Sequence, residues 1–313
     1  MAFSIREEGL SNDKKIILCD ETLGTTAEIF CFGALLNAFT AQKEGLSYNI
    51  IDGFVDVANA RLEMNNGFKS AKLSPFVCRM RDGQYSFEQQ NFKIEGFYLN
   101  GHAIHGLLCH SDFIITEKGA NGEKAWVCLS YHYKGTDKGF PFEYRLAITW
   151  TLYANNYLTV TTGATNLHTN RIPFTDGWHP YFTVGESIDT ATLQFNTAKK
   201  LVFDADLLPT GEEEQDGRFL NGTLLAGIEL DNCYALSQNE PVTCILKNSN
   251  IMISIEPDST YPYLQVYTPP HRKSIAIENL TAAPDAFNNK IGLKYLQPGE
   301  SINCTTGYRI TLL

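Results

Sequence analysis

The sequence has no long hydrophobic run. None of its apolar stretches approaches the roughly 18 consecutive residues that a membrane-spanning helix needs. The first 15 residues carry Arg6, Glu7, Glu8 and Asp13, where a secretory signal peptide would need an apolar segment. We therefore expect a soluble, cytoplasmic protein that has no membrane partner.

Positive charge is also scarce. The 25 Lys and Arg residues face 35 Asp and Glu residues, which gives a formal net charge of −10. Phosphate groups would repel such a chain, and the sequence has no cluster of Lys and Arg that would offset the repulsion. We therefore expect no nucleic-acid partner. The 43% of hydrophobic and 19% of charged residues predict a folded chain with a full core rather than a disordered one.

The motifs of several common chemistries are absent. There is no G-x-G-x-x-G, P-loop, G-x-S-x-G or H-E-x-x-H segment, so nucleotide binding, acyl transfer and zinc-peptidase chemistry have no motif support. The eight cysteines form no C-x-x-C pair, and no Cys/His pair has zinc-finger spacing. Because a chain of 313 residues needs no disulfides to fold, we expect buried free thiols.

Strand signals dominate over helix signals. Apolar side chains alternate with others over residues 144–152, Asn155-Asn156 supplies a turn, and residues 157–166 return as a second strand. Further strands are expected at 25–31, 33–40, 126–133, 243–247, 251–256 and 264–268, and short helices only at 55–64 and 284–289. Without linkers or repeats, the pattern predicts one all-β domain over residues 1–313. Two packed antiparallel sheets or a barrel would satisfy it, and the length favours a large antiparallel β-sandwich.

Three histidines lie close together in the segment that starts at Asn100. His102 and His105 are three residues apart, and His110 follows soon after. These imidazoles would suit a metal site, or one of them would line a pocket or bind the backbone. The spacing leaves these interpretations open, and we expect no bound metal.

Two other ionisable residues lie in apolar, strand-like surroundings. His179 comes between the turn-forming pair Asp176-Gly177 and an aromatic run, and Glu278 ends the apolar strand 275–279. Burying such groups is costly unless they are paired or held for a task. His179 is therefore either structural or catalytic, and Glu278 lies either at a rim or in an active site.

Asp231 and Arg79 each have an ordinary interpretation and a functional one. Asp231 precedes Asn232-Cys233-Tyr234, where it would cap a turn or accept a hydrogen bond from a ligand hydroxyl. Arg79 would form a surface ion pair or bind a ligand. Neither residue decides a function by itself.

Together and in this order, these segments resemble the aldose 1-epimerase (galactose mutarotase) family. Residues 75–79 resemble its arginine motif, residues 100–106 its Asn…His-Gly-Gly element, and Asn166 with residues 179–182 its Asn…His-x-Tyr-Phe element. Asp231 matches the sugar-binding aspartate, and Glu278 with Thr281 matches the C-terminal catalytic segment. Each motif is short, but the common order makes the resemblance specific, and it covers most of the chain.

The resemblance implies a galactose mutarotase-like supersandwich that interconverts the α and β anomers of a free monosaccharide without a cofactor. It implies that Glu278 is the general base at the anomeric hydroxyl and His179 the general acid at the ring oxygen. His105 would assist at that oxygen or orient the sugar. The sugar-binding residues would be Arg79, Asp231 and Asn100, with Trp178, Tyr181 or Phe182 as a flat aromatic neighbour. The protein would act as a monomer or a homodimer.

The sequence also departs from the family pattern. Cys78 stands where the family often has Asn, Leu107 replaces the second Gly after His105, and Trp178 and Pro180 frame His179 differently. These changes bear on galactose preference more than on proton transfer. Three alternatives remain: a sugar-binding or regulatory protein without turnover, a hexose-6-phosphate mutarotase, and a glycoside-processing enzyme with Asp231 as its second carboxylate. The Pro-Trp-Phe-Gly type segment of the hexose-6-phosphate branch is absent, which disfavours a phosphorylated substrate.

Overall fold

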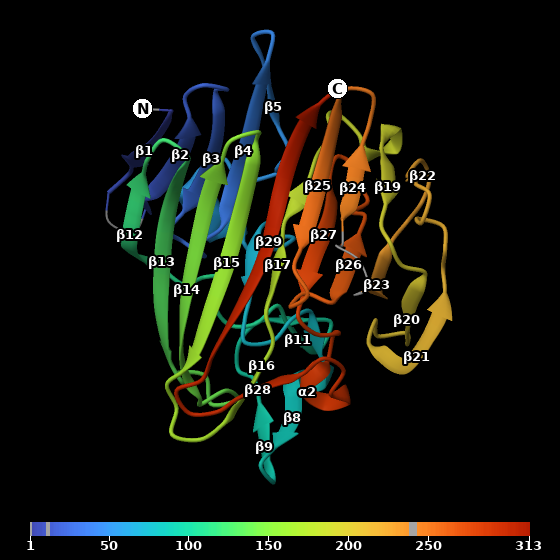
Figure 1. The fold of residues 1–313 in the computed structure, drawn as a ribbon. Helices are drawn as coiled ribbons and strands as arrows, with labels where there is room; N and C mark the ends of the chain where they lie inside the picture. Colours follow the sequence, from blue (N-terminus) through green and yellow to red (C-terminus); the bar gives the residue numbers. More distant parts are fainter. Residues whose placement is uncertain (1, 11–12, 238–242) are drawn as a thin grey trace.

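The computed structural model describes residues 2–10, 13–237 and 243–313. Its largest sheet has nine strands and forms one broad layer of the molecule (Figure 1). In spatial order these strands are β12 (Ile114–Ala120), β13 (Lys124–Lys134), β14 (Glu143–Tyr153), β15 (Tyr157–Asn166), β29 (Ser301–Leu312), β25 (Ile251–Pro257), β24 (Cys244–Lys247), β19 (Thr192–Gln194) and β22 (Thr223–Leu224).

A second sheet carries most of the polar residues of interest. It comprises β21 (Pro209–Gln215), β20 (Lys199–Phe203), β23 (Asp231–Ala235), β26 (Tyr263–Tyr267), β27 (Ile275–Leu280), β17 (Gly177–His179) and β6 (Ala71–Leu73), with β18 (Tyr181–Phe182) also paired to β27. A five-stranded sheet extends the fold with β1 (Phe3–Glu8), β2 (Lys15–Asp20), β3 (Thr25–Phe30), β4 (Leu36–Lys43) and β5 (Leu46–Asn49).

Shorter elements complete the fold. A three-stranded sheet contains β10 (Tyr98–Leu99), β11 (His102–Ile104) and β7 (Arg79–Met80). Two pairs are β8 (Gln84–Phe87) with β9 (Gln90–Lys93), and β16 (Ile172–Phe174) with β28 (Lys294–Leu296). The helical elements are α1 (Val57–Glu63), α2 (Ala286–Asn289) and the 3₁₀ turns η2 (Arg81–Gly83) and η3 (Ile188–Thr190).

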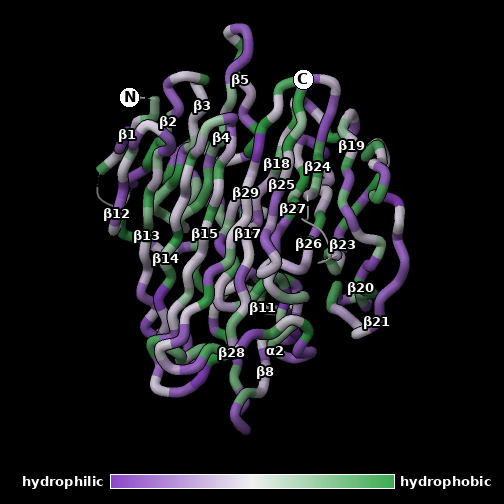
Figure 2. Tube along the Cα trace, viewed as in Figure 1, coloured by the Kyte–Doolittle hydropathy of each residue, from purple (hydrophilic) through white to green (hydrophobic). Residues whose placement is uncertain are grey.

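The core lies between the sheets because their strands alternate apolar and polar side chains. In β14, for example, Tyr144, Leu146, Ile148 and Trp150 are buried, while Arg145 between them is exposed. Figure 2 shows this alternation as changes of hydropathy along neighbouring strands. The main cluster of buried apolar residues draws on the chain from Phe3 to Ile310. Removal of this apolar surface from water is the principal force that holds the sheets together.

The structure confirms the predicted all-β sandwich and the hairpin of β14 and β15. The two expected helices are present as α1 and α2, and Asp56 caps α1 by accepting a hydrogen bond from the backbone of Asn59. The strand expected at 33–40 is partly wrong, because the chain turns at Gly33 and Ala34, both at positive φ, before β4 begins. All eight cysteines are free; seven are buried and Cys128 is half-buried.

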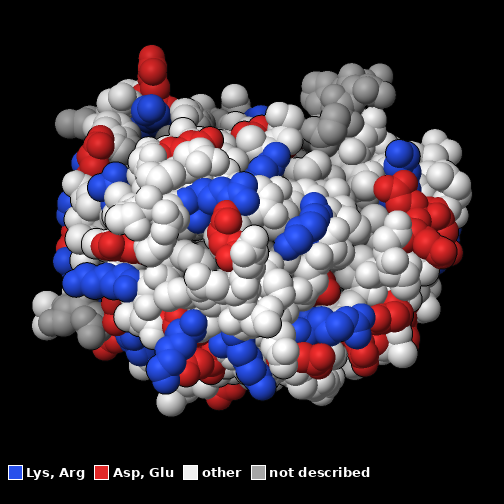
Figure 3. Space-filling view, turned by 90° about the horizontal axis from the view of Figure 1, so that it is seen from below, with Lys and Arg blue, Asp and Glu red and all other residues white. Residues whose placement is uncertain are grey.

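Within the described residues, no helix is both long and apolar enough to cross a membrane. On the face shown in Figure 3, side chains of Lys and Arg are interspersed with those of Asp and Glu. Ion pairs between exposed side chains of the protein include Lys138 with Glu95 and Arg171 with Glu88. Among the described residues of this face, the charges of the two signs are mixed.

Candidate active site

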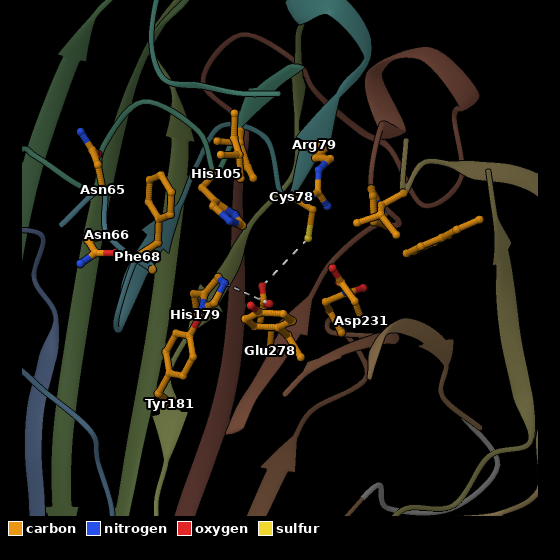
Figure 4. A pocket seen from close by; sticks show the side chains of 18 residues that line it. Asn65, Asn66, Phe68, Cys78, Arg79, His105, His179, Tyr181, Asp231 and Glu278 are labelled. Carbon is orange, nitrogen blue, oxygen red and sulfur yellow. Dashed lines mark hydrogen bonds and ion pairs between the residues drawn. The ribbon is translucent and has the colours of Figure 1, made fainter. Parts of the chain in front are cut away.

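Two neighbouring strands bring His179 and Glu278 together. The antiparallel register pairs Gly177 with Leu280 and Tyr181 with Ala276, so it places His179 directly opposite Glu278. Residues opposite each other in such a ladder point to the same face. His179 Nε2 lies 3.3 Å from Glu278 Oε1, and both side chains are buried (Figure 4). An imidazole and a carboxyl group far apart in the sequence therefore form one pair.

Two residues with a left-handed backbone conformation bring further side chains to this point. Cys78 and His105 have φ of 48° and 61°, a conformation that is uncommon outside glycine, and the backbone N–H of His105 donates to the Cys78 carbonyl at 2.9 Å. The Cys78 Sγ atom lies 4.0 Å from Glu278 Oε2, and the His105 ring stands edge-on to that of His179, with 4.8 Å between centroids. Position 106 requires glycine, because a Cβ atom there would lie 2.3 Å from the Ser74 carbonyl oxygen.

Polar groups from β23, β26 and β7 form the opposite side of the site. Gln265 lies opposite Glu278 in the ladder of β26 and β27, and its Nε2 donates to Asp231 Oδ1 at 2.7 Å. The Gln265 Oε1 atom is buried without a hydrogen-bond partner among the described residues. Arg79 is half-buried, and its guanidinium makes no hydrogen bond or ion pair within the described part of the chain. These groups are free to bind a polar ligand.

These side chains surround one cavity of about 320 Å³, which falls in the usual size range of small-molecule sites. Strands supply its polar floor, while connecting segments supply much of its rim (Figure 4). The cavity is lined by Asn65, Asn66, Gly67, Phe68, Cys78, Arg79, Leu99, Ile104, His105, His179, Tyr181, Phe203, Leu207, Asp231, Gln265, Tyr267, Glu278 and Pro284. It thus combines hydrogen-bonding groups with aromatic and aliphatic surfaces.

Burial favours the neutral form of each ionisable group at the centre. Burial raises the pKa of Glu278 well above its ordinary value; nearby Asp231 adds to the shift and Arg79 opposes it. Burial lowers the pKa of His179 to about 4. Burial also lowers the pKa of His105 well below its ordinary value, and His179 and Arg79 add to the effect. The pocket therefore raises the pKa of the Glu278 carboxyl group and lowers the pKa values of the two imidazoles.

The three-histidine metal site considered from the sequence is wrong. His102 Nδ1 accepts a hydrogen bond from the backbone of Asp82, and His110 Nε2 bonds to Asn65 Oδ1, so these two rings lie apart from His105. Among the described residues, the group with ligand atoms within 4.8 Å of one another is His105, His179 and Glu278.

This trio fits a metal ion poorly. Histidines that bind a metal normally donate through their other ring nitrogen to a fixed partner. The Nδ1 atoms of His105 and His179 have no such partner among the described residues. The guanidinium of Arg79 also lines the same cavity and would oppose a cation.

The cavity brings together Arg79, His105, His179, Asp231 and Glu278, all of which were expected from the sequence to form the site. Two others do not line it. Asn100 is an exposed residue in the turn between β10 and β11. Trp178 faces the core between the sheets, 5.4 Å from the ring of Trp150, because successive residues of β17 point to opposite faces. The predictions that these two contact the sugar are therefore not supported.

The expected turn at Asp176-Gly177 is also wrong. Asp176 is fully buried and forms an ion pair with Lys72, and Gly177 begins β17. Of the three aromatic candidates, Tyr181 lines the cavity and stacks on His179, whereas Phe182 belongs to the core.

Sequence reasoning missed Gln265. It lies in an expected strand with apolar neighbours on both sides, and that placement was the available signal. The Asn65, Asn66 and Phe68 side chains were also missed, because they come from a connecting segment with no motif.

Comparisons with known proteins identify the relatives of this chain. A family model described as aldose 1-epimerase matches residues 15–309. The uncharacterized protein YihR of Escherichia coli strain K12 is 26% identical over 238 residues, which cover 73% of this chain and 74% of that protein.

Solved structures show the same fold. A galactose mutarotase-like protein from Clostridium acetobutylicum has a TM-score of 0.87 at 22% identity and covers 100% of this chain and 99% of its own. A galactose 1-epimerase from Lactobacillus acidophilus NCFM has a TM-score of 0.82 at 18% identity, with 99% of this chain and 98% of its own covered. Because the family model spans nearly the whole sequence, the chain belongs to the aldose 1-epimerase family.

Proposed function

We propose that this protein interconverts the α and β anomers of a free monosaccharide by general acid–base ring opening. The observation that carries the proposal is the placement of the buried His179 directly opposite the buried Glu278, 3.3 Å apart, in one cavity. A site that only bound sugar would need hydrogen-bonding groups but no such proton-transfer pair. We further propose that the whole chain forms one domain, since its main apolar cluster draws on both ends of the sequence.

Opening a hemiacetal requires two proton transfers. One group removes the proton from the anomeric hydroxyl while another delivers a proton to the ring oxygen. We assign the first task to Glu278 and the second to His179. Rotation about the bond between C1 and C2 followed by reclosure, with the two roles reversed, gives the other anomer. Each general catalyst typically contributes about 10²–10⁴-fold to the rate.

The reaction needs one proton on the pair in total. Proton transfer from His179 to the ring oxygen, together with uptake by Glu278, leaves a neutral imidazole and a neutral carboxylic acid beside the open-chain aldehyde. Burial favours this neutral combination, because it raises the pKa of Glu278 and lowers that of His179. The cavity therefore stabilises the open-chain stage relative to the ion pair that starts the reaction.

The remaining groups of the cavity suit a polyhydroxylated ring. Arg79 offers donors, while Asp231 and the unpaired Gln265 Oε1 offer acceptors. Tyr181 lies 5.1 Å from the His179 ring at an interplanar angle of 24°, which limits the movement of the imidazole. We propose that His105 orients the sugar next to His179, as their edge-on contact supports.

The charge of the cavity favours a free sugar over a sugar phosphate. Among its lining residues, Arg79 is the single Lys or Arg side chain, whereas Asp231 and Glu278 are both acidic. A phosphate group is normally bound by several positively charged hydrogen-bond donors. A hexose-6-phosphate mutarotase is therefore the less favoured candidate.

Polarimetry of freshly dissolved α-glucose and α-galactose tests the proposal. Wild-type protein should accelerate the approach to the anomeric equilibrium, and Glu278→Gln should reduce that acceleration by about 10²–10⁴-fold. A wild-type rate equal to that of buffer would contradict the proposal and would favour a binding protein. Release of an aryl group from an aryl glycoside would instead indicate a glycosidase, with Asp231 as the second carboxylate.

A further inference from the structure

A buried ion pair lies on the core side of the strand that carries His179. Lys72 of β6 and Asp176, which precedes β17, are both fully buried, and Lys72 Nζ lies 2.6 Å from Asp176 Oδ2. Lys72 pairs with Trp178 in the ladder, while the neighbouring Ala71 pairs with His179. The ion pair and the catalytic imidazole therefore extend from opposite faces of the same pair of strands.

The lysine is fully hydrogen-bonded. Besides Asp176, its ammonium donates to the Gly177 carbonyl at 3.1 Å and to Thr162 Oγ1 of the nine-stranded sheet at 3.2 Å. Tyr261 donates to the same Asp176 oxygen at 2.8 Å, and the ammonium lies 4.2 Å from the centre of a Trp178 ring. These bonds tie the start of β17 both to its neighbour β6 and to the opposite sheet.

The same aspartate is joined by its backbone to the strand that carries Glu278. The Asp176 N–H donates to Thr281 Oγ1 at 2.8 Å, and the Thr281 N–H donates to the Asp176 carbonyl at 2.9 Å. Asp176 lies three residues before His179, and Thr281 lies three residues after Glu278. In antiparallel strands, contacts at this point set the register at the catalytic pair.

Stability alone does not account for a charged pair in this place. Replacing a buried ion pair by apolar side chains of similar volume is often neutral or stabilising, and the best-attested role of buried polar groups is to specify register. A slip of one residue would turn His179 into the core and Trp178 into the cavity. It would also leave Lys72 buried without its partner, which makes the slipped arrangement costly.

We propose that the Lys72–Asp176 ion pair is a positioning device that fixes the register of β6, β17 and β27, so that His179 faces Glu278. Its kinetic consequence rests on the proposed function, whereas its structural consequence does not. Neither residue lines the cavity; both act through the strand that carries the imidazole.

The test compares single and double replacements. Lys72→Met and Asp176→Leu should each lower the melting temperature, because each leaves one buried charge unpaired. The double variant Lys72→Met/Asp176→Leu should recover much of that temperature but keep a kcat about 100-fold below wild type, since a displacement of about 1 Å at the reacting groups has that effect. The matched control, Lys138→Gln/Glu95→Gln, removes an exposed ion pair and should change neither value.

A folded double variant that keeps the wild-type kcat would overturn the proposal, because the ion pair would then be merely structural. A second readout is the titration of the His179 ring by NMR, assigned by comparison with His179→Asn. In the double variant, the pKa of His179 should move from about 4 toward 6.5 as its fixed, buried position is lost. An unchanged titration would also overturn the proposal. If the wild type shows no mutarotase activity, the proposed function fails, and the NMR titration alone decides the positioning role.

Discussion

Replacement of His179 by Asn offers a quantitative test of the pocket, because the burial of this neutral ring affects stability as well as activity. The pKa of His179 is about 4 in the folded protein, below its ordinary value of 6.5, since burial penalises the charged form. Because the unfolded chain binds a proton at His179 more readily than the folded protein does, acidification lowers the free energy of unfolding. The contribution of the neutral ring is fully present above pH 6.5 and is lost as the pH falls toward the folded pKa. From pH 7 to pH 4 the loss amounts to about 3 kcal/mol.

The His179→Asn variant lacks the titrating ring. Its free energy of unfolding should therefore fall by about 3 kcal/mol less than that of the wild type between pH 7 and pH 4. Urea unfolding at both pH values, followed by tryptophan fluorescence, measures the difference. The exposed His271→Asn replacement is the control and should behave as the wild type does.

The same variant should lose about 10²–10⁴-fold in kcat, because it removes the proposed general acid. If the wild type and His179→Asn lose equal stability on acidification, the ring is not buried in its neutral form, and the reasoning about the cavity fails. If kcat stays at the wild-type value while the stability difference appears, His179 is buried but is not the acid.

Three further predictions address the rest of the site. The profile of kcat/KM against pH should have an acid limb near pH 4 and an alkaline limb above the ordinary range of a carboxylate, because the pKa of His179 is lowered and that of Glu278 is raised; an acid limb near 6.5, measured by polarimetry, would contradict this. Gln265→Met should raise KM by about tenfold with a smaller change in kcat, since it removes the hydrogen bond that orients Asp231; an unchanged KM in initial-rate measurements would refute this role. Trp178→Phe should lower the free energy of unfolding by about 1–3 kcal/mol and leave KM unchanged, because the ring packs in the core. Unchanged urea unfolding together with a raised KM in initial-rate measurements would contradict this.

The proposed catalytic pair was recognisable in the sequence because ionisable residues are rare in apolar strands. His179 and Glu278 lie in such surroundings, and the ordered motifs of one family connected them. The strand alternation also decides which neighbours share their face: Tyr181 does, whereas Trp178 points to the core. Trp178, Tyr181 and Phe182 were all candidates for the aromatic neighbour of the sugar, and the sequence did not choose among them, because nearness to His179 in the chain does not give the face of the strand.

Tertiary contacts account for the other failures. Asp176-Gly177 has the local signature of a turn, but the partnership of Asp176 with Lys72 holds the segment inside the sandwich. Lys72 itself carried no signal, because lysine is almost never fully buried unless it is paired with a distant residue. Gln265 was overlooked because a neutral amide in a strand does not raise the question that a charge raises. Its importance follows from the ladder that places it opposite Glu278.

The proposed proton-transfer groups and the residues at the cavity entrance come from different parts of the fold. This separation affects how the range of sugars proposed to bind there could change. The groups proposed to move protons, His179 and Glu278, lie on paired strands, whose mutual alignment depends on many hydrogen bonds. Asn65, Asn66, Leu99 and Leu207, by contrast, are exposed or half-buried and lie in or beside connecting segments at the entrance. Loops tolerate insertions and substitutions better than the sheets they join. Recruitment of a new monosaccharide, in evolution or by engineering, is therefore open to changes at the entrance while the reactive centre stays intact.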